Sequence, residues 1–169
     1  MTKQLLKKIS ITTEVWSKAK TGRTLNIMTV QASLQKLRTI WVERISRELA
    51  AGEGVRAGFA EELERFYELL EQAVATGDMA WLDPILYDWG RSPTETNLEQ
   101  ADYYVSFVLN RMIAITIEVA RDHLKNKDAL ELLTAVTPVL AHSLSVVVRY
   151  EMETRVAHIS KELGYVKEK

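Results

Sequence analysis

Residues 129–148 read ALELLTAVTPVLAHSLSVVV, and residues 103–120 read YYVSFVLNRMIAITIEVA. In both stretches the apolar residues recur all round a helix of 3.6 residues per turn, instead of alternating with the period of two that a strand shows. Each stretch also carries polar or charged residues, such as Glu118 and His142, which are costly at bilayer depth. We therefore expect two enclosed core helices, over about 94–124 and 129–163, and no membrane span.

Local signals set the ends of these two helices. Ser92-Pro93-Thr94-Glu95 combines an N-cap serine, a proline at the first helical position and a glutamate that closes a capping box. Lys125-Asn126-Lys127 is expected to form the turn between the helices, with Asp128 as the next cap. A bend is expected at Pro138, because proline removes one backbone hydrogen bond.

The helical period also governs the residues that precede these stretches. The sequence AGEGVRAG at 51–58 predicts a turn, and Gly77 and Asp78 predict a helix end followed by an N-cap. The expected helices span residues 3–20, 27–51, 59–75 and 79–88.

Composition limits the fold and the chemistry. The chain has 169 residues, 47% of them hydrophobic, with three prolines and no cysteine. A chain of this length can bury a sizeable core without disulfides or metals. We expect an all-α, single-domain helical bundle with a long C-terminal exit helix. Its parts are a basic N-terminal helix (1–24), a sensor-like bundle (25–163) and a polar tail (164–169).

Charge is unevenly distributed along the chain. Residues 1–47 carry ten Lys and Arg against two Glu, whereas residues 48–100 carry twelve acids against three Arg. The basic segment is of a kind that can bind DNA or another anion. The near-equal opposite charges favour the alternative that the two segments pack against each other, within one chain or across a dimer.

No motif points to catalysis or to a cofactor. The glycines near residue 54 are spaced one residue too widely for a dinucleotide fingerprint, and no strand precedes them. The three histidines form no Glu-x-x-His pair, so the di-iron bundle pattern is absent. Ser143 and Ser145 closely follow His142, but no nucleophile elbow surrounds either serine. We expect no enzyme activity, no metal and no cofactor.

Aromatic residues with a few polar neighbours suggest one small-molecule pocket. Such a combination is typical of ligand sites, although aromatic residues at helical spacing are more often simple core. The candidate pocket residues are Trp81, Trp89, Tyr104, Arg111, His142 and Arg149.

The exit helix narrows to coiled-coil spacing after Tyr150. Val156, Ile159 and Leu163 recur at steps of three and four between charged residues. We expect either that two copies pack in register along these residues and convey a shift, or that the segment packs on its own chain. The all-round apolar helices in front of it favour a homodimer.

The order of elements resembles one protein family. The tryptophan-bearing IWVERI (40–45) leads into Phe59-x-x-Glu62-Leu63-x-x-Phe66-x-x-Leu69-Leu70, then Gly77-Asp78, a short helix and two long ones. Over about residues 35–163 this is similar to the N-terminal sensor domains of stressosome co-antagonists of the RsbR type. The resemblance implies a globin-like or bundle-like helical domain that dimerises, lacks haem and signals down a helix to a C-terminal output domain. The extra basic N-terminal helix departs from that pattern.

Together these observations predict a cytoplasmic, non-enzymatic sensory or regulatory domain. It is expected to dimerise and to transmit a signal through its C-terminal helix to an output domain or partner protein, in a stress response. The alternative is a DNA- or anion-binding regulator that uses residues 1–47. This alternative is less favoured because the sequence lacks a compact helix-turn-helix pattern.

Overall fold

The computed structural model describes residues 26–50, 53–91 and 105–167, and it is an all-α helical bundle with a long C-terminal helix. The expected helix at 3–20 and the capping signature at 92–95 lie outside the described residues. The elements are α2 (Ile27–Leu49), α3 (Glu53–Thr76), the short 3-10 helix η1 (Met79–Leu82), α4 (Asp83–Arg91), α5 (Val105–His123) and α6 (Asn126–Lys167).

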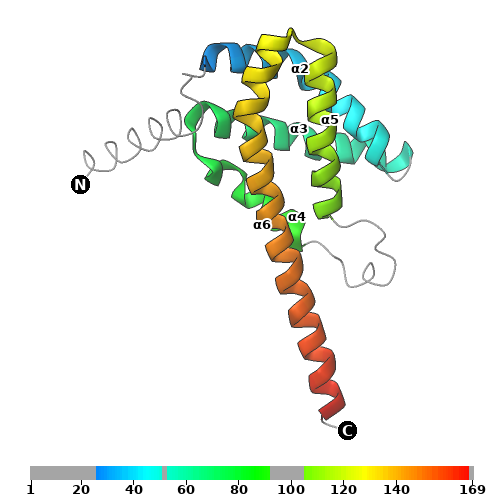
Figure 1. Ribbon diagram of the computed structural model, residues 1–169. Coiled ribbons are helices and arrows are strands. Elements are labelled where there is room, and N and C mark those ends of the chain that lie inside the picture. The colour runs from blue at the N-terminus through cyan, green and yellow to red at the C-terminus, as the bar shows by residue number, and fades with distance from the viewer. Residues whose placement is uncertain (1–25, 51–52, 92–104, 168–169) are drawn as a thin grey trace, which may run out of the picture.

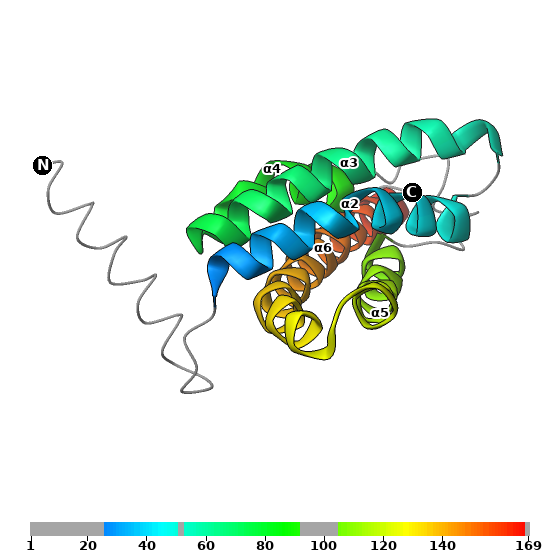
Figure 2. The ribbon, with the colours of Figure 1, turned by 90° about the horizontal axis from the view of Figure 1, so that it is seen from above.

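The bundle consists of two antiparallel helix pairs that cross each other. Helices α2 and α3 lie side by side and run in opposite directions, and the α5–α6 pair crosses beneath them (Figure 2). Helix α4 packs against α6 near the middle of its length. Helix α6 continues well beyond the other elements (Figure 1). The fold expected from the helical period is therefore confirmed.

A tryptophan at the centre of α2 joins the two pairs. The spacing of apolar residues along α2 places Leu34, Leu37, Trp41 and Ile45 on one buried face of this helix. The indole Nε1 of Trp41 donates a hydrogen bond of 2.8 Å to Thr116 Oγ1 on α5. The ring contacts Phe66 and Tyr67 of α3 at centroid distances of 6.3 and 5.0 Å. One side chain thus holds three helices in register.

The helix ends are partly where the sequence places them. Gly77 has φ of 70°, and the side chain of Asp78 accepts a hydrogen bond of 3.0 Å from Ala80 N, so the helix end and the cap are confirmed. The turn expected at 51–58 is wrong beyond residue 52, because α3 already begins at Glu53. The turn expected at 125–127 is also too long, since α6 begins at Asn126.

A glycine allows α4 to approach α6 closely. A Cβ atom built on Gly90 would lie 2.6 Å from the Cβ of Tyr150, so any side chain there would push the two helices apart. The ring of Tyr150 also meets Tyr87 of α4 edge-on, at a centroid distance of 5.4 Å. This contact marks the level at which α6 leaves the bundle.

Helix α6 therefore has two parts, which we call the bundle half (residues 126–151) and the stalk (residues 152–164). The bundle half carries core residues such as Leu132, Val139 and Val147, and the stalk residues are mostly exposed. The helix passes through Pro138 and extends to Lys167. The helix thus ends beyond the expected end at residue 163, and the division of the chain into an N-terminal helix, a bundle and a polar tail stays a prediction.

By length and composition alone, α6 is apolar enough to cross a membrane, with a mean hydropathy of 1.6 in its most apolar window. A core helix of a bundle passes the same test. Cytoplasmic localisation stays a prediction.

Candidate interaction surface

Opposite charges on α2 and α3 meet directly. The guanidinium of Arg38 lies 2.6 Å from Glu64 Oε2, 2.6 Å from Glu68 Oε1 and 3.6 Å from Glu71 Oε2. The hydrogen bonds that Arg38 donates to the carboxylates of Glu68 and Glu64 raise the pKa of Arg38. The expectation that the basic and acidic segments pack on each other is confirmed at this contact, within one chain.

A second network joins α2 to α5. Arg44 pairs with Glu48 at 2.6 Å and with Glu118 at 2.8 Å, and Arg111 reaches the same two carboxylates at 2.8 and 3.5 Å. Hydrogen bonds from Arg44 and Arg111 hold the pKa of Glu48 below its usual value. Arg111, a candidate pocket residue, therefore serves to connect two helices.

The other candidate pocket residues have separate surroundings. Trp89 stacks on Phe66 at a centroid distance of 5.1 Å and faces Glu62. Trp81 is exposed on η1, and the guanidinium of Arg149 lies 5.2 Å from the ring centre of its neighbour Tyr150. His142 is half-buried on α6, and Tyr104 lies outside the described residues. None of these contacts joins two of the six candidates, so a common pocket stays a prediction.

Two carboxylate oxygens are buried without a hydrogen-bond partner among the described residues, Glu71 Oε1 and Glu131 Oε2. Burial raises the pKa of Glu71. Burial likewise raises the pKa of Tyr67, whose hydroxyl donates to the Leu34 carbonyl at 2.7 Å. In the part of the chain that the structure describes, no group of three His, Asp or Glu side chains could hold a metal ion.

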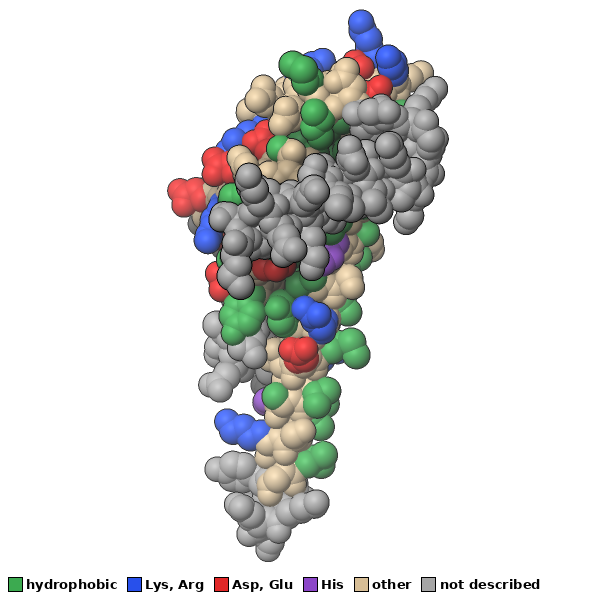
Figure 3. Space-filling view, turned by 90° about the vertical axis from the view of Figure 1, so that its left-hand side faces the viewer, with side chains coloured by type: hydrophobic (Ala, Val, Ile, Leu, Met, Phe, Trp, Pro, Cys, Tyr) green, Lys and Arg blue, Asp and Glu red, His purple; other side chains and the backbone are tan. Residues whose placement is uncertain are grey.

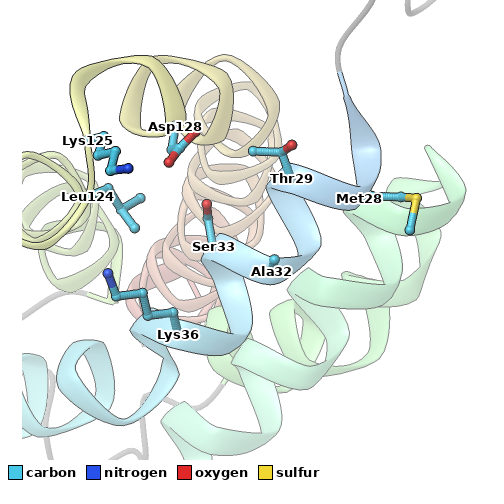
Figure 4. Close-up of a pocket in the computed structure, with 8 residues that line it drawn as sticks. All are labelled: Met28, Thr29, Ala32, Ser33, Lys36, Leu124, Lys125 and Asp128. Carbon is cyan, nitrogen blue, oxygen red and sulfur yellow. The ribbon is translucent and has the colours of Figure 1, made fainter.

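A hollow lined by polar and apolar side chains lies at the end of the bundle farthest from the stalk (Figure 1 and Figure 4). It has a volume of about 420 Å³ and lies between α2 and the α5–α6 turn. The side chains of Ser33, Lys36 and Lys125 reach into it, and Asp128 lines it as well. The ammonium of Lys36 already donates to the carbonyl of His123 at 3.0 Å. None of the five candidate pocket residues that the structure describes lines this hollow.

The most distinctive surface is on the stalk. Met152, Val156, Ile159 and Leu163 follow one another at steps of four, three and four, and each is more than half exposed. We call these four residues the outer stripe. Figure 3 shows hydrophobic side chains along one edge of the protruding helix. Apolar residues at this spacing are the contact positions of a coiled coil.

The outer stripe begins within a shallow apolar hollow. This hollow has a volume of about 560 Å³ and lies along α6 from the lower bundle half into the stalk. Its lining residues are Ser145, Val148, Arg149, Met152, Glu153, Val156 and Ala157. It therefore joins Arg149 with Val156, two residues that the sequence assigned to different sites.

A contact that the sequence did not reveal fixes the base of the stalk. The backbone N–H of Ser106, near the start of α5, donates to Glu151 Oε1 at 3.0 Å. A carboxylate at the first turn of a helix also interacts favourably with the helix dipole. The partners lie 45 residues apart in sequence, so no local pattern could have paired them.

Comparison with protein-family models, with curated proteins and with solved structures found no match. The resemblance to stressosome sensor domains therefore stays a prediction.

Proposed function

We propose that this chain is a non-enzymatic regulatory domain of the cytoplasm that pairs with a second copy through α6. A change in the bundle is transmitted by the stalk to an output domain or a partner protein. The observation that carries the proposal is the outer stripe, four large apolar side chains that are exposed at coiled-coil spacing. They lie on the same helix whose other half contributes to the core.

The continuity of α6 supports transmission. The same 42-residue helix contains fully buried residues, such as Val147, and exposed ones, such as Leu163. Any shift of the helix within the bundle moves the stalk with it, because the backbone hydrogen bonds are intrahelical. Helix shifts at subunit interfaces are a known means of switching.

The alternative function, binding of DNA or another anion by residues 1–47, receives little support from the described part of that segment. Arg38, Arg44 and Arg47 all form ion pairs with glutamates of the same chain. Their charge is thus largely compensated. A titration of DNA affinity against salt separates the two functions, since phosphate contacts give a steep salt dependence.

Sedimentation of a double variant tests the proposed function. Val156→Asp with Ile159→Asp places two charges on the outer stripe, and we expect the dimer to dissociate at micromolar concentration while the bundle keeps its helical circular dichroism spectrum. The matched control, Lys161→Asp, changes the net charge by the same amount at an exposed position on another face of the helix and should stay dimeric. A wild-type chain that sediments as a monomer of 19.3 kDa would overturn the proposal.

A further inference from the structure

The residues of the outer stripe also favour one orientation, parallel or antiparallel, for a second copy of the chain that packs on it. In heptad notation Val156 and Leu163 occupy a positions, and Met152 and Ile159 occupy d positions. Arg149 is the a position one step closer to the bundle. Two stalks can place these layers together in a parallel or in an antiparallel arrangement, and the two arrangements bring different residues into contact.

The shape of the surface distinguishes the two arrangements. The apolar hollow lies along residues 145–157 and includes Met152 and Val156, and Ile159 and Leu163 are the exposed residues of the outer stripe that project beyond it. In a parallel pair each hollow would face the same hollow of the partner, and the projecting residues would face each other. In an antiparallel pair the projecting residues of each stalk enter the hollow of the other. Interfaces pack as densely as protein interiors, which favours the second arrangement.

The charges agree with the shape. A parallel pair would place Arg149 against the partner's Arg149 in the a layer, which brings like charges together. An antiparallel pair places g positions beside each other, so Arg155 lies next to the partner's Glu162, and this contact occurs twice by symmetry. Within its own chain Glu162 lies 3.1 Å from His158, so the contact with Arg155 adds a second basic partner. The central layers are then Val156 with the partner's Ile159, and Met152 with the partner's Leu163.

We infer that the occupant of the outer stripe is a second copy of this chain in antiparallel orientation. The inference rests on the dimer of the proposed function and specifies its geometry. The far end of each stalk then lies on the bundle half of the other subunit, near Arg149. A shift of α6 in one bundle is thereby delivered to the partner's bundle across the pair.

Cysteine cross-linking of the full chain tests the orientation, because the chain contains no cysteine of its own. Met152→Cys and Leu163→Cys are prepared separately, one of them with a tag that changes its mass. In the antiparallel pair two copies of Met152→Cys place their cysteines eleven residues apart, about 16 Å along the axis, too far for a disulfide. The two variants mixed after subunit exchange place cysteines in one layer.

We expect oxidation to link the mixed pair and to leave each variant alone unlinked, with Lys161→Cys as an unlinked control. Efficient linking of each variant with itself would overturn the antiparallel orientation while the dimer and the proposed function stand. A dimer that links in neither experiment would overturn the pairing through the outer stripe. A wild-type monomer in sedimentation would overturn the dimer itself, and with it both proposals.

Discussion

The two parts of α6 have the same pattern of apolar residues and opposite surroundings. In the bundle half, Leu132, Val136 and Val139 are almost completely buried against α2, α3 and α5. In the stalk, Val156 is 62% exposed and Leu163 is 59% exposed, at the same steps of three and four. Periodicity therefore shows that a helix has an apolar face, but the chain's other helices decide whether that face is covered.

The difference is physical as well as topological. Burial of one large aliphatic side chain contributes about 1.5–3 kcal/mol to stability, and the bundle half gains this at many positions. The stalk gains nothing comparable within one chain. A long helix with an uncovered apolar face is typical of a surface that another molecule completes.

The largest expected effect is on the covered side of this comparison. Trp41→Ala removes a buried ring that contacts Phe66 and Tyr67, and leaves Thr116 without its donor. We expect a loss of about 3–5 kcal/mol in the free energy of unfolding, measured by denaturant titration. Ile159→Ala, its counterpart in the stalk, should change the unfolding of the bundle by less than about 0.5 kcal/mol when the chain is diluted until it is monomeric. Equal losses would mean that the stalk is part of the bundle core.

A pair of glycines provides a sharper test of where α6 leaves the bundle. Gly90→Ala forces a Cβ against Tyr150, and we expect a loss of about 1–3 kcal/mol in stability. Gly58 is also helical but has open space around it, so Gly58→Ala should stabilise the chain by about 0.5–1 kcal/mol. Thermal melting of both variants measures the contrast. A neutral Gly90→Ala would contradict the close approach of α4 to α6.

Local features of this fold could be predicted and long-range ones could not. Gly77 and Asp78 were predictable, because a helix end and an N-cap depend on neighbouring residues. The start of α3 was missed because Gly54 and Gly58 weaken a helix by about 1 kcal/mol each, and packing of the rest of α3 overrides that preference. The bond between Trp41 and Thr116 spans 75 residues, so no spacing rule reveals it.

The candidate site shows the same limit. Val156, Ile159 and Leu163 were correctly placed on one helix, because heptad spacing is a local property. The five candidate pocket residues that the structure describes come from four elements, η1, α4, α5 and α6, and their joint position depends on tertiary packing. The exposure of the outer stripe likewise depends on how far α5 and α4 extend along α6.

The smallest expected effect on stability comes from two carboxylates at the edge of the bundle, whose pKa values are shifted in opposite directions. Burial raises the pKa of Glu71, so its charge counts against the folded state at neutral pH, and that cost is relieved as the pH falls towards 4.5. Arg44 and Arg111 lower the pKa of Glu48, so its charge stabilises the folded state above pH 4.5, and that contribution is lost at more acidic pH.

Glu71→Gln and Glu48→Gln should therefore change stability in opposite directions at pH 7, each by less than about 1 kcal/mol. Glu71→Gln is expected to be neutral or stabilising, because Arg38 retains its ion pairs with Glu64 and Glu68, both at 2.6 Å. Glu48→Gln should destabilise the chain, because it weakens the contacts of two arginines. Denaturant titrations of both variants and of the wild type at pH 7 and at pH 4 measure these differences, and both should shrink at the lower pH. A larger loss at pH 7 for Glu71→Gln than for Glu48→Gln would mean that the ion pair with Arg38 outweighs the cost of burying Glu71.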